Sequence, residues 1–319
     1  MSALLVLTLH HIGDVLFTEP AIAALKAGHP EKPLLVVTSQ EGEAVLKGHP
    51  AIDQLWVRVR TVRGFGRLLR WLRQHRATAA VSFSPSSLGL ALATLLSGAK
   101  RRFGFTFRFH VSIFFTDKLP MQPQRHVVDD YLALAKAAGG KKERRIPRLF
   151  LRPEEEAWGR EWLRAQGWDE TTPLLGCHPF SSVASKEWGL TNFAILLQWV
   201  RKELGWLPIV FGSLGEREKA EKLAAEGKGV AAAGKLSLRQ FIAVAKWCTG
   251  FIGGDSGPIH LAAALGVPTV ALFGPTDPHR SGPLGNHVWV AKSPTKRMED
   301  LSVETVRELV KAVLGGISG

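Results

Sequence analysis

The sequence predicts an α/β fold built from two domains of similar size that face each other across a cleft. Three observations carry this prediction. The chain has 319 residues, which is more than a single hydrophobic core usually organises. Strand-like and helix-like patterns alternate in two separate series, as is typical of parallel sheets with helices on both faces. A charged stretch with two prolines, residues 144–167, separates the two series.

The first series opens with the continuous apolar run 3–9, which indicates a buried parallel strand. A helix pattern through residue 27 follows, and strand and helix patterns then continue to alternate. The further segments are the strands 33–39, 53–59 and 77–83 and the helices 41–49 and 64–76. We assign residues 1–150 to this first domain.

Residues 151–172 are expected to connect the domains through a charged surface helix at 154–167. The second series of strand and helix patterns follows, and we assign residues 173–319 to the second domain. Its predicted strands are 173–179, 207–213, 250–254, 269–274 and 287–292, and its predicted helices are 192–205, 216–227, 238–248, 259–266 and 303–315. Neither solenoid repeats nor low-complexity tracts interrupt the two series.

The composition indicates an ordinary folded protein, since 45% of the residues are hydrophobic and 22% are charged. Cys177 and Cys248 lie far apart and show no metal-ligand spacing, which favours a reducing cytoplasm. No basic residue precedes the first apolar run, so we expect no secretory signal. The longest apolar run, 88–96, is far shorter than the ~20 residues that span a bilayer. We therefore expect a soluble, cytoplasmic protein.

A net charge of +13 implies an anionic partner, which could be nucleic acid, a membrane surface or a phosphorylated substrate. The basic clusters lie in the first half of the chain. Arginines three or four residues apart predict a cationic stripe along one helix, formed by Arg63, Arg67, Arg70, Arg73 and Arg76. Two more clusters are the aromatic-rich segment 100–110, expected as a loop, and residues 141–145. The alternative for the stripe is a solvated helix face.

Six consecutive residues that favour turns, 253–258, stand between two apolar runs. Asp255 or Ser256 is suited to cap the helix that follows, and Pro258 fits its first turn. A positive helix end with unbonded amides is a site for a phosphate. The amides expected there belong to Ser256, Gly257, Ile259 and His260. The alternative is a tight turn with a good cap and no ligand.

Two other loops that follow strands carry polar side chains suited to the same ligand. One offers the hydroxyls of Ser181 and Ser182 and the mobile cation of Lys186, although exposed lysines are mostly solvated. The other offers Glu216, which could accept hydrogen bonds from a ribose or could complement a helix dipole.

The N-terminal turn lacks the G-x-G-x-x-G pattern, which argues against a nicotinamide or flavin enzyme, and no P-loop motif occurs in the chain. Gly13 and Asp14 remain at the end of the first strand. A carboxylate there could remove a proton from an attacking hydroxyl or could cap the helix. His10 and His11 are neighbours that point opposite ways in an extended chain, so we expect no metal site.

Taken together, these loops resemble glycosyltransferase family 9, the bacterial heptosyltransferases of lipopolysaccharide core assembly. The resemblance covers nearly the whole chain and rests on residues 11–30, 178–189 and 253–278. It implies the GT-B fold, in which the first Rossmann-like domain binds the acceptor and the second binds the nucleotide sugar. It also implies inverting, metal-independent transfer of heptose from ADP-heptose to a Kdo or heptose acceptor on lipid A, with no cofactor. The two histidines before Ile12 are similar to the heptosyltransferase III branch.

The resemblance further implies a role for each motif residue, with Asp14 as the catalytic base. The donor diphosphate would be contacted by Ser181, Ser182 and Lys186, while Glu216 would lie near the ribose and Leu236 near the adenine. The sugar and the diphosphate would be held by Asp255, Ser256, Gly257 and His260. The acceptor would be bound by His11, Gly13, Arg67, Arg70, Arg101 and Arg102. Because this acceptor sits at an anionic membrane, we expect a peripheral location on the inner face of the inner membrane.

Two alternatives stay open. Another GT-B enzyme acting on nucleotide sugars, such as a UDP-sugar epimerase or an N-acetylglucosaminyl transferase, would prefer a different nucleotide. A basic nucleic-acid-binding protein fits the charge, but the sequence shows no recognisable module that reads nucleic acid. We therefore expect no nucleic-acid partner.

Overall fold

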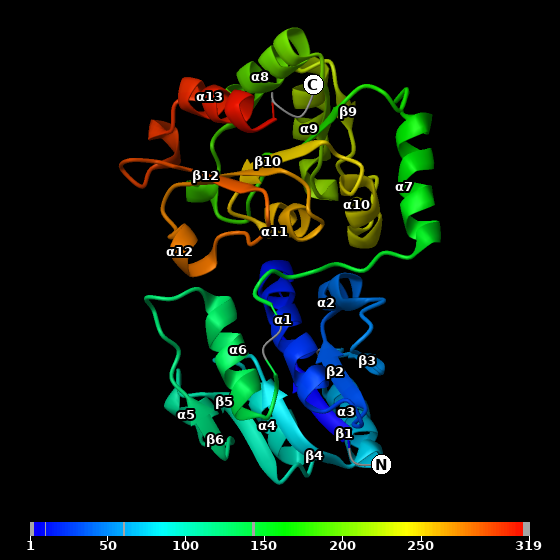
Figure 1. Cartoon of the computed structure of the whole chain (residues 1–319), viewed down its shortest axis with the longest axis vertical. Helices are drawn as coiled ribbons and strands as arrows, with labels where there is room; N and C mark the ends of the chain where they lie inside the picture. The colour runs from blue at the N-terminus through cyan, green and yellow to red at the C-terminus, as the bar shows by residue number, and fades with distance from the viewer. Residues whose placement is uncertain (1–2, 10, 60, 142–143, 315–319) are drawn as a thin grey trace. The chain divides into compact units, whose positions relative to one another are not determined.

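The computed structural model describes residues 3–9, 11–59, 61–141 and 144–314 (Figure 1). The chain divides into two compact units, Met1–Phe150 and Leu151–Gly319, called unit 1 and unit 2 below. Each unit contains a parallel sheet of six strands with helices packed against it. The predicted α/β fold class is therefore confirmed. Within the described ranges, no helix combines the length and apolar character needed to cross a membrane.

In unit 1 the strands follow the order β3-β2-β1-β4-β5-β6, and neighbouring strands are parallel. The chain starts at the centre, builds outward to β3 and then crosses back to β4. Every residue of the central β1 and of β2 is buried, as their apolar sequences require. The strands are β1 Ala3–Leu7, β2 Leu34–Thr38, β3 Gln54–Val57, β4 Ala77–Ser82, β5 Arg101–Phe105 and β6 Asp117–Leu119.

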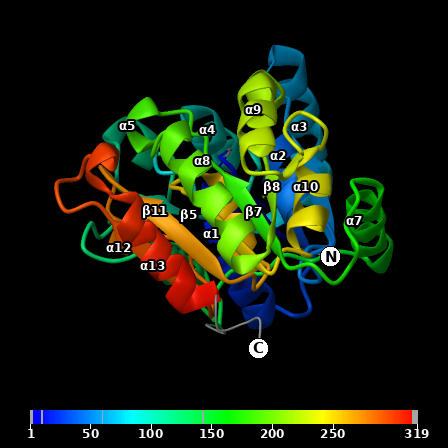
Figure 2. The same ribbon diagram turned by 90° about the horizontal axis from the view of Figure 1, so that it is seen from above.

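The helices of unit 1 form two groups. α1 packs on α2 and α6, whereas α4 packs on both α3 and α5. Figure 2 shows α4 and α5 beside each other. Ser39, Thr61 and Ser87 begin three of these helices, and each side chain accepts a hydrogen bond from the amide three residues later. The helices are α1 Ile12–Gly28, α2 Gln40–Leu46, α3 Val62–His75, α4 Leu88–Leu96, α5 Phe109–Ser112 and α6 Val127–Ala137.

In unit 2 the strands follow the order β12-β11-β10-β7-β8-β9, again with parallel neighbours. The order reverses between β7 and β10. The strands are β7 Leu174–His178, β8 Leu207–Val210, β9 Val230–Ala231, β10 Gly250–Gly254, β11 Thr269–Phe273 and β12 Val288–Lys292. The helices are α7 Pro153–Ala165, α8 Leu190–Trp199, α9 Arg217–Glu226, α10 Leu238–Ala245, α11 Gly257–Ala264, α12 Pro278–Ser281 and α13 Val303–Leu314.

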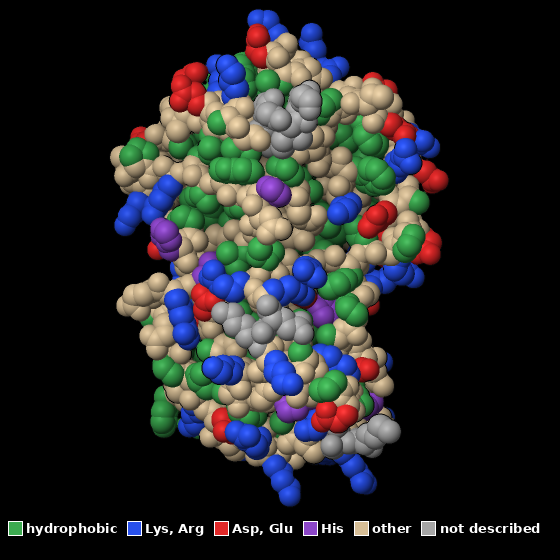
Figure 3. Space-filling model, in the orientation of Figure 1, with side chains coloured by type: hydrophobic (Ala, Val, Ile, Leu, Met, Phe, Trp, Pro, Cys, Tyr) green, Lys and Arg blue, Asp and Glu red, His purple; other side chains and the backbone are tan. Residues whose placement is uncertain are grey.

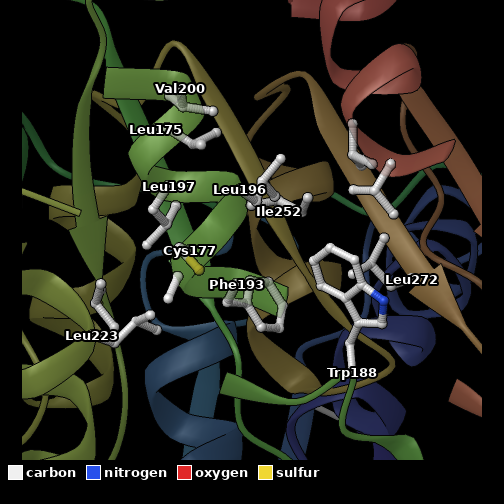
Figure 4. Packing of buried hydrophobic residues seen from close by; sticks show 14 of the residues in the cluster. Leu175, Cys177, Trp188, Phe193, Leu196, Leu197, Val200, Leu223, Ile252 and Leu272 are labelled. Atoms are coloured by element: carbon white, nitrogen blue, oxygen red, sulfur yellow. The ribbon is translucent and has the colours of Figure 1, made fainter. Parts of the chain in front are cut away.

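The core of unit 2 forms between strands and helices α8, α9 and α13 (Figure 4). Cys177 and Ile252 from the sheet belong to the same buried cluster as Phe193 of α8. Trp188 is buried with them, and its indole N–H donates to the carbonyl oxygen of Leu301 (2.6 Å). The loop that follows β7 is therefore anchored by a core residue at its far end.

Segment 151–172, expected to connect the domains, clusters with unit 2. Its helix α7 packs on α10, where the Glu155 carboxylate accepts a hydrogen bond from Arg239 (2.7 Å). The Trp247 indole also donates to the carbonyl oxygen of Glu156 (3.0 Å). The charged sequence of α7 indicated a surface helix. The sequence does not show which acidic residues of this helix have a partner in another element.

Segment 100–110, expected as a loop, contains strand β5 and the start of α5 instead. This expectation was wrong because mixed arginines and aromatics hide the strand pattern: β5 is exposed at Arg101 and buried from Phe103 onward. Gly104 makes the tight packing possible. A Cβ at this position would lie 2.3 Å from the ring of Phe115, so a larger residue would require that buried ring to move.

Glu19 is a buried charge inside α1 that ties the end of unit 1 to its first helix. Its carboxylate accepts hydrogen bonds from the guanidinium of Arg144 and from the amide of Arg148 (2.9 Å), and it contacts His49 Nε2 (2.7 Å). Burial raises the pKa of Glu19, but the hydrogen bonds from Arg144 and His49 outweigh burial and hold the pKa below its ordinary value. The folded state therefore contains a carboxylate here at neutral pH.

Replacing Glu19 with Ala is expected to destabilise unit 1 by about 3–5 kcal/mol, because the Arg144 charge loses its buried partner. The matched control is Asp129→Ala, which removes the more exposed partner of Arg145 (2.7 Å) and should cost at most about 1 kcal/mol. Thermal unfolding followed by circular dichroism compares the two. Equal losses would contradict the role given to Glu19.

Candidate functional site

The polar residues singled out in the second domain follow strands that meet at one edge of the sheet. Asp255 and Ser256 follow β10, and the loop with Lys186 follows β7. These two strands are neighbours, and the strand order reverses between them. In open α/β sheets, ligands bind outside the carboxyl ends of the strands at such a reversal.

Asp255 is the centre of this site. Its Oδ2 lies 2.7 Å from Lys186 Nζ and accepts a hydrogen bond from Thr276 Oγ1 at 2.8 Å. Its Oδ1 lies 3.5 Å from His260 Nε2. The structure thus brings together one carboxylate, one ammonium, one imidazole and one hydroxyl, drawn from four segments of unit 2.

The charge of Asp255 is held by these neighbours. Burial raises its pKa, but hydrogen bonds from His260 and Lys186 outweigh burial and keep the pKa well below the ordinary value. Asp255 is mostly buried, whereas the Lys186 side chain is 25% exposed. The pair therefore presents a positioned ammonium group that remains accessible from solvent.

The glycines of the turn leave room for this arrangement. A Cβ on Gly253 would lie 2.7 Å from the carbonyl oxygen of His178, and a Cβ on Gly254 would lie 3.0 Å from that of Lys186. Side chains here would push the loop after β7 away from β10. The two glycines therefore allow Lys186 to reach Asp255.

Ser256 begins α11 but does not cap it with its side chain. Its hydroxyl instead lies 3.3 Å from His178 Nδ1 and 3.3 Å from the carbonyl oxygen of Gly254. One expected amide is not available, because the Ile259 N–H donates to the carbonyl oxygen of Ser256 (3.2 Å). The first turn of α11 is tighter than an ideal α-helix, so this amide is used within the turn.

Ser181 and Ser182, which were expected to contact a diphosphate, lie in the loop after β7 and differ in their surroundings. The amide of Ser181 donates to Glu187 Oε1 (3.0 Å), and the hydroxyl oxygen of Ser181 accepts from the amide of Val183 (3.3 Å). Ser182 is exposed. Diphosphate contacts by Ser181 and Ser182 stay predictions.

Glu216 and Leu236 lie in the loops after β8 and β9, at the same edge of the sheet. Glu216 Oε2 accepts from the amide of Ser213 (2.6 Å) and so caps the short helical turn Leu214–Glu216. The two loops touch where the amide of Gly234 donates to the carbonyl oxygen of Gly212 (3.1 Å). The structure thus shows a capping role for Glu216, and its contact with a ribose stays a prediction.

In unit 1, Asp14 lies in the first turn of α1, directly after the central strand β1. The residue at the N-cap is His11, so Asp14 is not the helix cap. Gly13 lies in the same turn, while His10 is outside the described residues. Asp14 is half-buried and follows the strand beside which the order of unit 1 reverses, between β1 and β4.

The four arginines expected to bind an acceptor do not cluster with Asp14 on α1. Arg67 and Arg70 are exposed on α3. Arg101 pairs with Asp117 (2.8 Å), and Arg102 donates to the carbonyl oxygens of its neighbours Phe114 (2.8 Å) and Ala99 (3.0 Å). The guanidinium of Arg102 is therefore engaged within unit 1.

Two site residues were missed by sequence reasoning, Thr276 and His178. Thr276 follows β11 and shares the carboxylate oxygen of Asp255 with Lys186. His178 ends β7, and burial lowers its pKa to about 4, so it is neutral at pH 7. His178 lies at the carboxyl end of a predicted strand and Thr276 lies just beyond another, and that position was the signal that could have found them.

The family model of glycosyltransferase family 9 (heptosyltransferase) matches residues 65–311. The chain belongs to glycosyltransferase family 9. It is therefore a glycosyltransferase, as the resemblance of its loops predicted. Lipopolysaccharide heptosyltransferase 2 of Salmonella typhimurium is 26% identical to it over 88% of this chain and 85% of its own length. Lipopolysaccharide heptosyltransferase 3 of Escherichia coli is 24% identical over 94% of this chain and 95% of its own length.

Solved structures of similar proteins share the fold of this family 9 enzyme. A glycosyl transferase family 9 protein from Veillonella parvula matches with a TM-score of 0.90 at 23% identity, over 99% of this chain and 97% of that one. The ADP-heptose lipopolysaccharide heptosyltransferase II of Escherichia coli matches with a TM-score of 0.85 at 22% identity, over 99% and 100%. The predicted GT-B fold is confirmed.

The lowered pKa of Asp255 predicts how the stability of the protein depends on pH. A carboxylate whose pKa is lowered by folding stabilises the protein above its unfolded pKa, near 3.8, and this stabilisation is lost as the pH falls toward the folded value. The difference in melting temperature between wild type and Asp255→Asn should therefore be constant from about pH 7 to 5 and shrink only below about pH 4. Asp277→Asn, at the exposed N-cap of α12, is the control and should change little, since Asn caps as well as Asp. A difference that already shrinks above pH 5 would contradict the lowered pKa.

Proposed function

We propose that this family 9 glycosyltransferase transfers heptose from ADP-heptose to the inner core of lipopolysaccharide, onto a Kdo or heptose acceptor carried by lipid A. The observation that carries the proposal is the group formed by Lys186, Asp255 and Thr276 beside the start of α11. Support also comes from relatives named lipopolysaccharide heptosyltransferase that match most of the chain. A related E. coli heptosyltransferase was solved with ADP.

The donor diphosphate would bind where the cation and the helix end meet. Lys186 supplies one positive charge, and the first turn of α11 adds the partial positive charge of a helix N-terminus. Ser256 and Gly257 lie at that helix end, and His260 follows one turn later. Charge that develops on the departing diphosphate would be stabilised by groups that are already in position.

The acceptor hydroxyl would be deprotonated by Asp14, which is a carboxylate at the first turn of α1. The hydroxyl oxygen forms a bond to the anomeric carbon while the bond from that carbon to the diphosphate breaks, and ADP leaves with the bonding electrons. One displacement of this kind inverts the anomeric configuration. His11 and Gly13, beside Asp14, are proposed to contact the acceptor near its reacting hydroxyl. The exposed Arg67 and Arg70 are proposed to contact anionic groups of the acceptor farther from that hydroxyl.

We propose that the reaction needs no metal ion, because Lys186 provides the cation that the diphosphate requires. No cofactor takes part in this scheme, and ADP-heptose is a co-substrate. Full activity in the presence of EDTA would support metal independence, and a loss restored by added Mg²⁺ would contradict it.

Asp14→Asn is expected to lower kcat by roughly 10²–10⁴-fold, since it removes the general base. Binding of ADP, measured by calorimetry, should stay unchanged. The matched control is Glu43→Gln, which changes one of the two first-turn acids of α2 and tests whether a lost helix-dipole interaction explains the effect. Transfer assays with ADP-heptose and truncated core acceptors compare the variants. A wild-type rate for Asp14→Asn would remove Asp14 from the mechanism.

Lys186→Gln is expected to weaken ADP binding by roughly tenfold or more, because a charge-assisted contact with the diphosphate is lost. Lys222→Gln, on the exposed surface of α9, is the control and should bind ADP normally. Thermal shifts with ADP, UDP and GDP test the nucleotide at the same time. A larger shift with UDP would favour an enzyme that acts on UDP-sugars and would contradict the ADP-heptose donor.

A further inference from the structure

Residues 54–116, called the basic segment below, contain eleven lysines and arginines and no aspartate or glutamate. The whole chain has a net charge of +13, so most of the excess positive charge lies in this one segment. It runs from β3 through α3, α4 and β5 past α5. A surface with this charge predicts an anionic partner.

The basic segment also carries most of the exposed large hydrophobic side chains. Across the described ranges eleven such residues are exposed, and seven belong to this segment: Val59, Val62, Leu88, Leu95, Phe107, Phe109 and Ile113. Phe109 is 83% exposed and Phe107 is 61% exposed. Single apolar residues on a surface need no explanation, but a group on neighbouring elements indicates an interaction surface.

Helix α4 shows how the fold turns these side chains outward. Its Leu90 and Ala93 belong to the buried cluster that includes Leu68 of α3. Leu88 and Leu95 lie two turns apart on α4 and are exposed, at 51% and 38%. The helix therefore has a buried apolar side and an exposed apolar side, with no charged residue in its sequence.

Helix α5 repeats this arrangement beside α4. Its Val111 is buried in a cluster with Ala91 of α4 and Phe115. Phe109 and Ile113, one turn apart, are exposed on the other side. The exposed apolar side chains of α4 and α5 thus lie on neighbouring helices.

Helix α3 adds positive charge on the other flank of α4. Its Leu68 and Leu72 are buried, and the polar side of the helix faces solvent. No ion pair within the described part of the chain involves its four exposed arginines, Arg63, Arg67, Arg70 and Arg73. A cavity of about 370 Å³ between the first turns of α3 and α4 continues the apolar surface, with Val62, Phe65, Leu68 and Leu90 among its lining residues.

The acidic residues of unit 1 lie elsewhere. Those described are Asp14, Glu19, Glu31, Glu41, Glu43, Asp53, Asp117, Asp129 and Asp130, most of them on or beside α1, α2 and α6. Figure 3 shows acidic and basic side chains together on the visible surface of this unit. The combination of apolar side chains, arginines and missing acids is therefore a property of the α3–α4–α5 layer.

We propose that the α3–α4–α5 layer of unit 1 binds the surface of an anionic lipid bilayer. Phe107, Phe109 and Ile113 enter the headgroup region, and the arginines of α3 meet the lipid phosphates. Apolar and aromatic side chains next to a basic face are what interfacial binding requires, since the bilayer offers both an apolar layer and negative charge. A nucleic-acid duplex supplies the phosphates but no apolar layer. This inference depends on unit 1 alone and not on which sugar the enzyme transfers.

Sedimentation with lipid vesicles tests the proposal without any sugar substrate. The enzyme is expected to bind phosphatidylcholine vesicles that contain phosphatidylglycerol, to bind pure phosphatidylcholine weakly, and to dissociate as salt is raised. Phe107→Ser with Phe109→Ser should lower the partition coefficient roughly tenfold or more. Arg67→Glu with Arg70→Glu should do the same, because each positive charge near the surface contributes roughly fivefold.

Matched controls come from unit 2. Ile195→Ser with Val290→Ser removes exposed apolar side chains, and Lys202→Glu with Lys219→Glu reverses exposed charges, so neither pair should change vesicle binding. An unchanged thermal shift with ADP shows that each variant is folded. This readout also separates the inference from the proposed transferase activity, because either can fail while the other holds.

A thiol label locates the inserted residues. Cys177 and Cys248 are buried, so an environment-sensitive dye should react selectively with Phe109→Cys. Its emission is expected to shift to the blue on anionic vesicles, and a label at Ile195→Cys should not respond. No vesicle binding, equal loss in all variants, or tighter binding to duplex DNA than to vesicles would overturn the proposal. Loss of a dimer in the phenylalanine variant, with no vesicle binding by wild type, would also overturn it.

Discussion

The ion pair between Lys186 and Asp255 is the interaction on which the site of unit 2 depends. It joins the loop after β7 to the end of β10, the two strands between which the strand order reverses. Glycines at the end of β10 leave room for that loop, and buried Trp188 anchors its far end in the core. One carboxylate thereby positions an ammonium, an imidazole and a hydroxyl where open α/β sheets bind their ligands.

The two units share one strand topology but place different side chains where the strand order reverses. In both, the first strand lies at the centre and the order reverses beside it, so a polar turn is placed at that point. Unit 2 gathers the Lys186–Asp255 ion pair there, whereas unit 1 places Asp14 in the first turn of α1. Unit 1 also differs between its two groups of helices. Glu19 of α1 forms a buried ion pair with Arg144, whereas the α3–α4–α5 layer is basic and has exposed apolar side chains.

Local sequence patterns predicted most strands and helices, because burial alternation and turn residues act over a few positions. They failed at 100–110, where the packing of Gly104 against Phe115 supports a strand that its arginines obscure. They also left Glu216 undecided, and the structure gives it a capping role. For Ile259 the local helix geometry differed from the ideal, and its amide is bonded within the turn.

The sequence alone determined the fold class, the division into two series of strands and helices, the loops that carry polar residues, and the excess of positive charge. These properties follow from composition and from short periodic patterns. The tertiary structure decided which residues meet: Asp255 pairs with a lysine 69 positions earlier, and Glu19 with an arginine 125 positions later. It also decided that the exposed leucines and phenylalanines share one layer with the arginines. Contacts between distant segments leave no local pattern, so only the packing of the folded chain reveals them.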